Sequence, residues 1–413
     1  MVTSTETPIA RRAITNEDEL LRFLSGREAA TVHAVGAAGS KSPCYQTSGT
    51  ALHLHGFNNV IAVDGNRVTV QAGATVGRLN AELARRGLAL PTHGEWAGAT
   101  VAGSMTSGTH GGSAHHGILA TSAVALRLVT AEGVAHDLRR GDPLFDHAAV
   151  SLGLLGVITH ITFECVEHFH LAMTMQVRRF PTFVATLADE QATHEFHAAI
   201  WIPTAERVVS FAADRVHSPR RTQRRRERFS PATFVLSKLS RDVGLHLIPR
   251  ALFSGTVVDA ADRILTPIRD GSKLVGAFRA ISNGWHAAEM AVPLERAGEA
   301  LERLHHFLSV RPRALVNPVG LRATAADTFT LSPCVERATF WFDLFYRDDP
   351  QFETDLSALF EDLDGRAHWG KHVALSPAHL QRQYPGWEAF RAARRRLDPA
   401  DRFGNQFSRR YGL

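Results

Sequence analysis

Thr100-Val101-Ala102-Gly103-Ser104-Met105-Thr106-Ser107-Gly108-Thr109-His110-Gly111-Gly112 is the stretch of this chain that decides its fold. Small residues fill most of it, and a backbone without bulky side chains can lie close to another group. Its hydroxyls and free amide N–H groups suit a diphosphate or the edge of a flavin. A flexible surface linker is the alternative, but the stretch is too long and too ordered in composition for one. We therefore interpret it as one wall of a ligand site.

Two further segments have the same glycine-punctuated character. Residues 31–35 form a β-prone run that ends in the tight turn Gly36-Ala37-Ala38-Gly39-Ser40-Lys41-Ser42-Pro43, whose free backbone N–H groups suit a phosphate. The turn is not a dinucleotide fingerprint, because no G-x-G-x-x-G opens a helix there. Residues 151–158 make another such approach to a strand. One ligand held by all three loops is simpler than three unrelated loops.

Composition sets the class of protein. The 413 residues suggest at least two lobes, and 44% hydrophobic with 21% charged residues is ordinary for a soluble globular chain. The formal charge of +5 is modest and not spread along one motif, so we expect no nucleic-acid partner. Cys44, Cys165 and Cys334 are too scattered for a metal spacing or a disulfide framework, which fits a reducing cytoplasm.

The expected location follows from the same features. The N-terminus lacks an apolar signal core, and no apolar run is long enough to span a membrane. The abundance of Ala and Arg is typical of a GC-rich bacterial genome. We therefore expect a cytoplasmic, bacterial protein.

Periodicity divides the chain into three parts. Residues 1–170 mix helical and strand patterns and contain all three glycine-rich loops. In residues 171–375, strand-like runs such as 337–346 flank longer helices such as 295–308, which indicates a second, sheet-based domain. Residues 376–413 are helical and then irregular.

A basic segment, 217–252, interrupts the second part. Its arginine-rich start is followed by apolar, helix-compatible residues. A surface that contacts a membrane or a partner is one interpretation, since a basic run beside an amphipathic helix has that property. A solvated insertion in the second domain is the alternative, and we favour it.

The order of motifs resembles that of a known family. Residues 32–43 resemble the first phosphate loop of the vanillyl-alcohol-oxidase (PCMH) type of FAD protein, and residues 100–112 resemble its second flavin loop. The tail resembles the C-terminal signature of the sugar-lactone and alditol oxidases, in His368-Trp369-Gly370-Lys371, Tyr384-Pro385-Gly386-Trp387 and Leu397-Asp398-Pro399. Two motifs of the middle domain resemble the aldonolactone oxidase branch, Glu289-Met290-Ala291-Val292-Pro293 and Leu331-Ser332-Pro333-Cys334.

The resemblance implies an α+β fold of three parts. An FAD-binding domain of two subdomains (1–170) precedes a substrate cap domain with an antiparallel sheet flanked by helices (171–375), and a tail (376–413) returns to the FAD domain. It also implies an FAD-dependent oxidoreductase that takes hydride from a CH–OH or CH–NH carbon of a small sugar-like or natural-product substrate, with O2 or another carrier as electron acceptor.

Two alternatives stay open at this point. One is an aldonolactone or alditol oxidase or dehydrogenase in the strict sense. The other is a catalytically degenerate flavin-fold protein that only binds a ligand, although the retention of Lys371 and of the whole second loop argues against it.

Three residues are the catalytic candidates. Within the resembling motif, Lys371 would stabilise the negative charge of a reduced flavin. The forked guanidinium donors of Arg322 suit a substrate oxygen or carboxylate. A purely structural ion pair of Arg322 is an equally good interpretation. His368 is a base or an orienting residue, with simple packing as the alternative.

The resemblance also implies a set of cofactor-binding positions. They are Gly36, Ala37, Ala38, Gly39, Ser40, Thr100, Gly103, Ser104, Thr106, Ser107, Gly108, His110, Gly111, Gly156, Val157, Ile158 and Asn405. We expect no metal, because the pairs at 115–116 and 305–306 have no matching carboxylate or cysteine cluster.

Two departures from the family pattern bear on function. Gly39 stands where the family has a histidine that bonds the flavin, so we expect non-covalent FAD and a weaker oxidant. Gly320 stands two residues before Arg322, where the family has a glutamate that binds or polarises substrate hydroxyls. We therefore expect a changed substrate.

Overall fold

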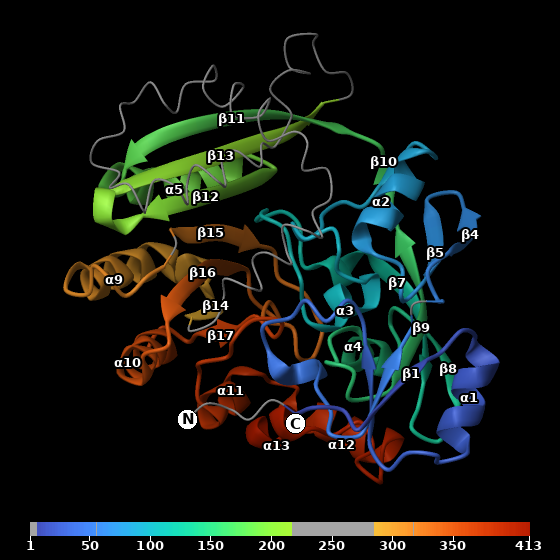
Figure 1. Cartoon of the computed structure of the whole chain (residues 1–413). Coiled ribbons are helices and arrows are strands. Elements are labelled where there is room, and N and C mark those ends of the chain that lie inside the picture. Colours follow the sequence, from blue (N-terminus) through green and yellow to red (C-terminus); the bar gives the residue numbers. More distant parts are fainter. Residues whose placement is uncertain (1–5, 55, 217–284, 317) are drawn as a thin grey trace, which may run out of the picture.

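The computed structural model describes every residue except 1–5, 55, 217–284 and 317 (Figure 1). The predicted basic insertion at 217–252 lies outside the described residues.

Two sheets dominate the N-terminal part. Three parallel strands form the smaller sheet, in the order β1 (Ala10–Ala13), β3 (Thr50–His53) and β2 (Val32–Val35). Five antiparallel strands form the larger sheet, in the order β4 (Val60–Asp64), β5 (Arg67–Gln71), β9 (Val157–Glu164), β7 (Ala123–Val129) and β8 (Ala135–Arg139). Two short strands, β6 (Leu88–Ala89) and β10 (Val166–Glu167), form a separate antiparallel pair.

Local sequence explains the helices of this part. In α1 (Glu17–Ser25), Asn16 accepts a hydrogen bond from the Glu19 amide, and Leu20, Phe23 and Leu24 form the buried face. The other helices are α2 (Val76–Ala84), α3 (Val101–Thr106) and α4 (Pro143–Ala149). The small-residue stretch is therefore not an open loop throughout, because its first half forms α3 behind the cap Thr100.

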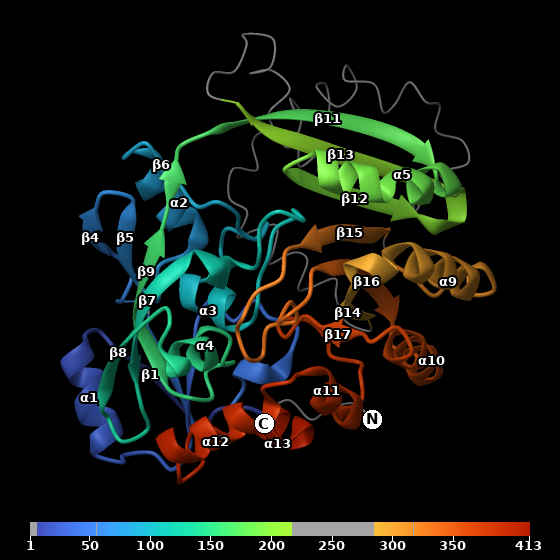
Figure 2. The same ribbon diagram turned by 180° about the vertical axis from the view of Figure 1, so that it is seen from behind.

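The middle part is a seven-stranded antiparallel sheet (Figures 1 and 2). Its order is β11 (His170–Arg179), β13 (Arg207–Val216), β12 (Phe196–Ile202), β15 (Val319–Thr324), β16 (Thr339–Arg347), β14 (Trp285–Pro293) and β17 (Arg366–Ala367). The flanking helices are α5 (Phe180–Thr193), α9 (Ala297–Ser309) and α10 (Pro350–Glu361). The predicted antiparallel sheet flanked by helices is confirmed.

Alternation along β16 separates the two faces of this sheet. Phe342 and Tyr346 pack against Phe360 and Phe352 of α10. Because successive side chains of a strand point to opposite faces, Asp343 faces away from α10. The helices thus cover one face of the sheet and leave the other face for the site.

The tail returns to the N-terminal part. Its helices are α11 (Pro377–Gln383), α12 (Trp387–Leu397) and α13 (Gln406–Tyr411), which run along the lower edge of the molecule in both views (Figures 1 and 2). Phe403 packs in the core cluster of α1, and the Arg402 guanidinium donates to the Leu24 carbonyl at 2.8 Å. Within the described residues, none of the helices is both long and apolar enough to cross a membrane.

Candidate active site

Strand register brings charged side chains together on the face of the seven-stranded sheet that points away from α10. Asp343 on β16 pairs with Glu289 on β14 and with Gly320 on β15. Trp341 pairs with Arg322 in the same way. Directly opposed residues of neighbouring strands point to the same side, so these side chains share one face.

Lys371 completes this group from the segment that follows β17. Its Nζ lies 3.0 Å from Asp343 Oδ1 and 3.7 Å from Glu289 Oε2. Burial alone would lower the pKa of Lys371, but the carboxylates of Asp343 and Glu289 outweigh it and raise that pKa above its usual value. The lysine is therefore a fixed cation at neutral pH.

The two carboxylates differ in their proton affinity. Burial would raise the pKa of Glu289, but Lys371 and His110 hold it well below its usual range. Burial dominates at Asp343 and raises its pKa, although Lys371 opposes the effect. Glu289 is thus a permanent anion, and Asp343 is the carboxylate better able to take a proton.

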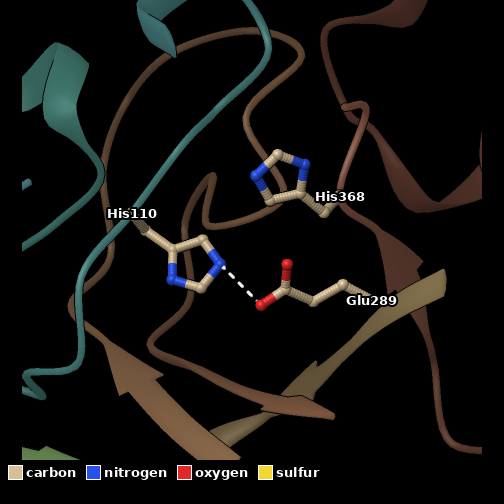
Figure 3. Close-up of side chains that lie close together, drawn as sticks. All are labelled: His110, Glu289 and His368. Atoms are coloured by element: carbon tan, nitrogen blue, oxygen red, sulfur yellow. Dashed lines mark ion pairs between the residues drawn. The ribbon is translucent and has the colours of Figure 1, made fainter. Parts of the chain in front are cut away.

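Two histidines lie against Glu289 (Figure 3). His110 Nε2 is 3.3 Å from Glu289 Oε1, and its ring stacks on Trp341 with centroids 3.9 Å apart and planes 18° apart. Burial lowers the pKa of His368 to about 3, so this ring is neutral. The Gly370 amide donates to His368 Nδ1 at 2.9 Å, which places the ring proton on Nε2. His368 therefore presents a donor toward the site.

Arg322 has an acidic partner from outside the sheet. Its Nη2 lies 3.2 Å from Glu95 Oε1, and the arginine side chain is largely buried while Glu95 is exposed. Burial would lower the pKa of Arg322, but Glu95, Glu289 and Asp343 raise it. The predicted ion-pair alternative is thus present, and the partner comes from the loop before α3.

The three glycine-rich loops contact one another. A Cβ at Gly36 would lie 2.3 Å from Thr100 Oγ1, so only glycine allows the first loop to approach the cap of α3. The Leu152 amide of the third loop donates to the Thr106 carbonyl at 3.2 Å. The three loops that were predicted to share one ligand therefore lie next to one another.

The Lys371 segment is tied to the first loop. The Gly370 carbonyl accepts hydrogen bonds from the Lys41 amide at 2.9 Å and from Ser40 Oγ at 2.8 Å. The phosphate-type loop and the lysine are therefore fixed relative to each other, although more than three hundred residues separate them in sequence.

Comparisons with known proteins assign the family. The sequence profile of D-arabinono-1,4-lactone oxidase matches residues 161–411, and that of an FAD-binding domain matches residues 12–139. The chain belongs to the D-arabinono-1,4-lactone oxidase family. It is therefore an FAD-dependent oxidoreductase.

Individual relatives of this family cover almost the whole chain. L-gulonolactone oxidase of Bos taurus is 29% identical over 403 residues, covering 91% of this chain and 88% of the relative. L-gulono-1,4-lactone dehydrogenase of Mycobacterium tuberculosis is 30% identical over 426 residues, covering 96% and 94%.

Solved structures share the fold. A cholesterol oxidase from B. sterolicum matches with a TM-score of 0.70 at 14% identity, covering 97% of this chain and 93% of that chain. A solvent-stable cholesterol oxidase matches with a TM-score of 0.75 at 16% identity, covering 98% and 94%. The predicted two-domain FAD-binding fold is confirmed.

The residues of the loops fit FAD. Ala38 adopts a left-handed backbone with φ 50°, a conformation that helps successive amides to converge on an anion. Ser104 and Ser151 are buried, and their hydroxyls have no hydrogen-bond partner within the described part of the chain. Such orphaned donors suit a polar cofactor between the second and third loops.

Trp96 occupies the space beside Gly39. A Cβ built on Gly39 would lie 1.8 Å from a ring carbon of Trp96. The position where the family has its flavin-bonding histidine is thus both without a side chain and covered by an indole ring.

The predicted cofactor-binding residues are not all equally placed. Val157 and Ile158 are buried in the cores around β9. Asn405 caps α13 and donates to the carbonyls of Cys44 and Gln46, both at 2.9 Å, so its visible role is to anchor the tail. His110, which was predicted to contact the cofactor from the second loop, lies against Glu289 of the cap sheet.

Sequence reasoning missed Asp343 and gave Glu289 no role. Both are charged residues inside otherwise apolar strands, in Phe340–Tyr346 and in Glu289–Pro293, and this contrast was the available signal. Trp341 and Tyr346 are fully buried.

Proposed function

We propose that this enzyme oxidises a CH–OH carbon of an aldonolactone or a closely similar sugar-like substrate, with non-covalent FAD. The carrying observation is the cation Lys371, fixed between Asp343 and Glu289 on the sheet face and tied through Gly370 to the first loop. The relatives named for gulono- and arabinono-lactones support this substrate class.

The chain supplies charge and hydrogen bonds around the reacting carbon. FAD, when bound, supplies the hydride acceptor. Lys371 presents a positive charge that stabilises negative charge developing in the site. Arg322 provides a forked donor for substrate oxygens, and His368 provides the Nε2 proton as a further donor.

Asp343 is the residue that we assign to the substrate's hydroxyl proton. Its Oδ1 contacts Lys371, and its Oδ2 faces Gly320 on the neighbouring strand. Burial raises the pKa of Asp343, which suits a carboxyl that takes up a proton. A Cβ at residue 320 would lie 3.1 Å from Asp343 Cβ, so a large side chain at 320 would crowd this carboxylate. Asp343, on the adjacent strand, thus takes the place of the acid that the family has at the position of Gly320.

The arrangement at Gly39 supports a non-covalent cofactor. No imidazole is present at this position, and Trp96 covers it. Among the described cysteines, Cys44 lies nearest in sequence, but it is buried, and burial raises the pKa of its thiol, which makes it a poor nucleophile. We also propose a location in the bacterial cytoplasm; the three free, buried cysteines support a reducing compartment.

An anaerobic stopped-flow experiment tests the proposal. The purified protein is mixed with L-gulono- and D-arabinono-1,4-lactone, with polyols and with amines, and the flavin absorbance is followed. We expect bleaching with the lactones and none with the amines. A colourless protein that takes up no FAD would refute the assignment, and bleaching by amines alone would refute the substrate class. The rates at which O2 and a quinone or dye re-oxidise the reduced flavin are then compared, and the faster oxidant identifies the class of electron acceptor.

A further inference from the structure

A second group of histidines lies on the outer side of the Lys371 segment. It comprises His286 at the start of β14, Glu353 in the first turn of α10, and His372, which directly follows Lys371. Their donor atoms lie within 4.8 Å of one another, although they come from three separate segments. We call these three residues the outer histidine cluster.

We propose that the outer histidine cluster binds a divalent transition-metal ion such as Zn2+. Two imidazoles and a carboxylate are the donor set that such ions prefer. Asp348 lies beside the cluster, with its Oδ1 3.3 Å from His286 Nε2. The Tyr346 hydroxyl donates to Glu353 Oε2 at 3.4 Å and orients that carboxylate from the outer shell.

Access and charge favour this cluster over the buried one. The side chains of His286, Glu353 and His372 are 30%, 25% and 20% exposed, so an ion can enter with part of its water. The buried trio of His110, Glu289 and His368 also has metal-type donors, but Lys371 and Arg322 lie beside it and repel a further cation.

Without an ion, each imidazole bonds a separate carboxylate. His372 Nε2 lies 2.9 Å from Glu353 Oε2. The rings of His286 and His372 stack with centroids 4.1 Å apart and planes 20° apart. Binding requires the rings to turn about their Cβ–Cγ bonds so that both lone pairs converge. The metal then replaces two hydrogen bonds with at least three coordinate bonds.

The position of His372 gives the site a consequence. The His372 amide donates to the Ala287 carbonyl at 2.8 Å, and one peptide bond joins it to Lys371. A metal held by His372, α10 and β14 would restrain the segment that carries the lysine. The inference concerns metal binding and does not depend on the substrate.

Calorimetric titration of the chelator-treated holoenzyme with Zn2+ tests the proposal. We expect one Zn2+ per chain, and at least about tenfold weaker binding for His286→Gln and for Glu353→Gln. The matched control is His194→Gln, because His194 is 31% exposed and bonds a single carboxylate, Asp214, at 2.7 Å. This control should bind Zn2+ like the wild type.

A second measurement needs no variant. Zn2+ should protect His286 and His372, but not His194, from diethyl pyrocarbonate, as read by mass spectrometry of the peptides. Equal Zn2+ affinity in the wild type and His286→Gln, or loss of binding only in His110→Asn, would overturn the proposal. Unprotected His286 and His372 at saturating Zn2+ would overturn it as well.

Discussion

Lys371 and Asp343 form an ion pair of 3.0 Å that joins the segment after β17 to strand β16 of the seven-stranded sheet. The two residues lie 28 positions apart in sequence, on either side of α10. Glu289 adds a second carboxylate at 3.7 Å from the same ammonium. The lysine is therefore positioned by the cap sheet, whereas its backbone is tied to the first loop.

Asp343→Asn tests the role of this pair. We expect kcat to fall about a hundredfold or more, because an amide cannot take up the substrate's hydroxyl proton and general-base catalysis contributes about 10²–10⁴-fold. Steady-state kinetics with a lactone substrate gives the measurement. The control is Asp355→Asn on α10, which pairs with Arg311 away from the site and should keep kcat. An unchanged kcat in Asp343→Asn would remove Asp343 from the mechanism.

Stability should fall in acid because of buried neutral histidines. Burial lowers the pKa of His33 to about 4 and that of His368 to about 3, below the value of about 6.5 for an unfolded histidine. Since the folded state binds these protons more weakly, protonation favours unfolding. The stabilisation is complete above about pH 6.5 and is lost progressively as the pH falls, toward about 4 for His33 and about 3 for His368.

The expected loss is about 2 kcal/mol per histidine at pH 5. Thermal unfolding of the wild type and of His33→Gln at pH 7.5 and pH 5 measures it. The variant should be less stable at pH 7.5, because it loses the contact with the Phe403 carbonyl, but its stability should depend less on pH. Identical pH dependence in both proteins would show that His33 does not titrate in this way.

Gly36→Ala should weaken the cofactor site. The added Cβ would lie 2.3 Å from Thr100 Oγ1, and we expect overpacking to cost about 1–3 kcal/mol and to lower the retention of FAD. Gly298→Ala is the matched control, since a Cβ there meets nothing within 4 Å in helix α9. FAD content per chain after gel filtration is the readout. Equal FAD content in the two variants would contradict the close approach of the loops.

Gly39→His should not by itself create a covalent flavin. Its Cβ would lie 1.8 Å from the Trp96 ring, so the imidazole has no room. We expect acid to release all flavin from the wild type and from Gly39→His. The double change Gly39→His with Trp96→Gly removes the obstruction, and fluorescence of the denatured chain on a gel then reports any bonded flavin. Covalent flavin in the single variant would disprove the blocking role of Trp96.

Much of the fold could be predicted from the sequence. The three glycine-rich loops and the motif His368–Lys371 have local signatures, and the structure brings them together. Asp343 and Glu95 could not be assigned in this way. Their roles depend on which strand lies beside Gly320 and which loop reaches Arg322, and strand order is a long-range property.

The C-terminal tail completes the packing of the N-terminal part. Phe403 fills the core beneath α1, Arg402 bonds the Leu24 carbonyl, and Asn405 bonds the carbonyls of Cys44 and Gln46. The segments that these residues complete are made more than three hundred residues earlier in the chain. A nascent chain therefore carries its first loops long before residues 402–405 can close them, and flavin capture becomes an event that follows the synthesis of this tail.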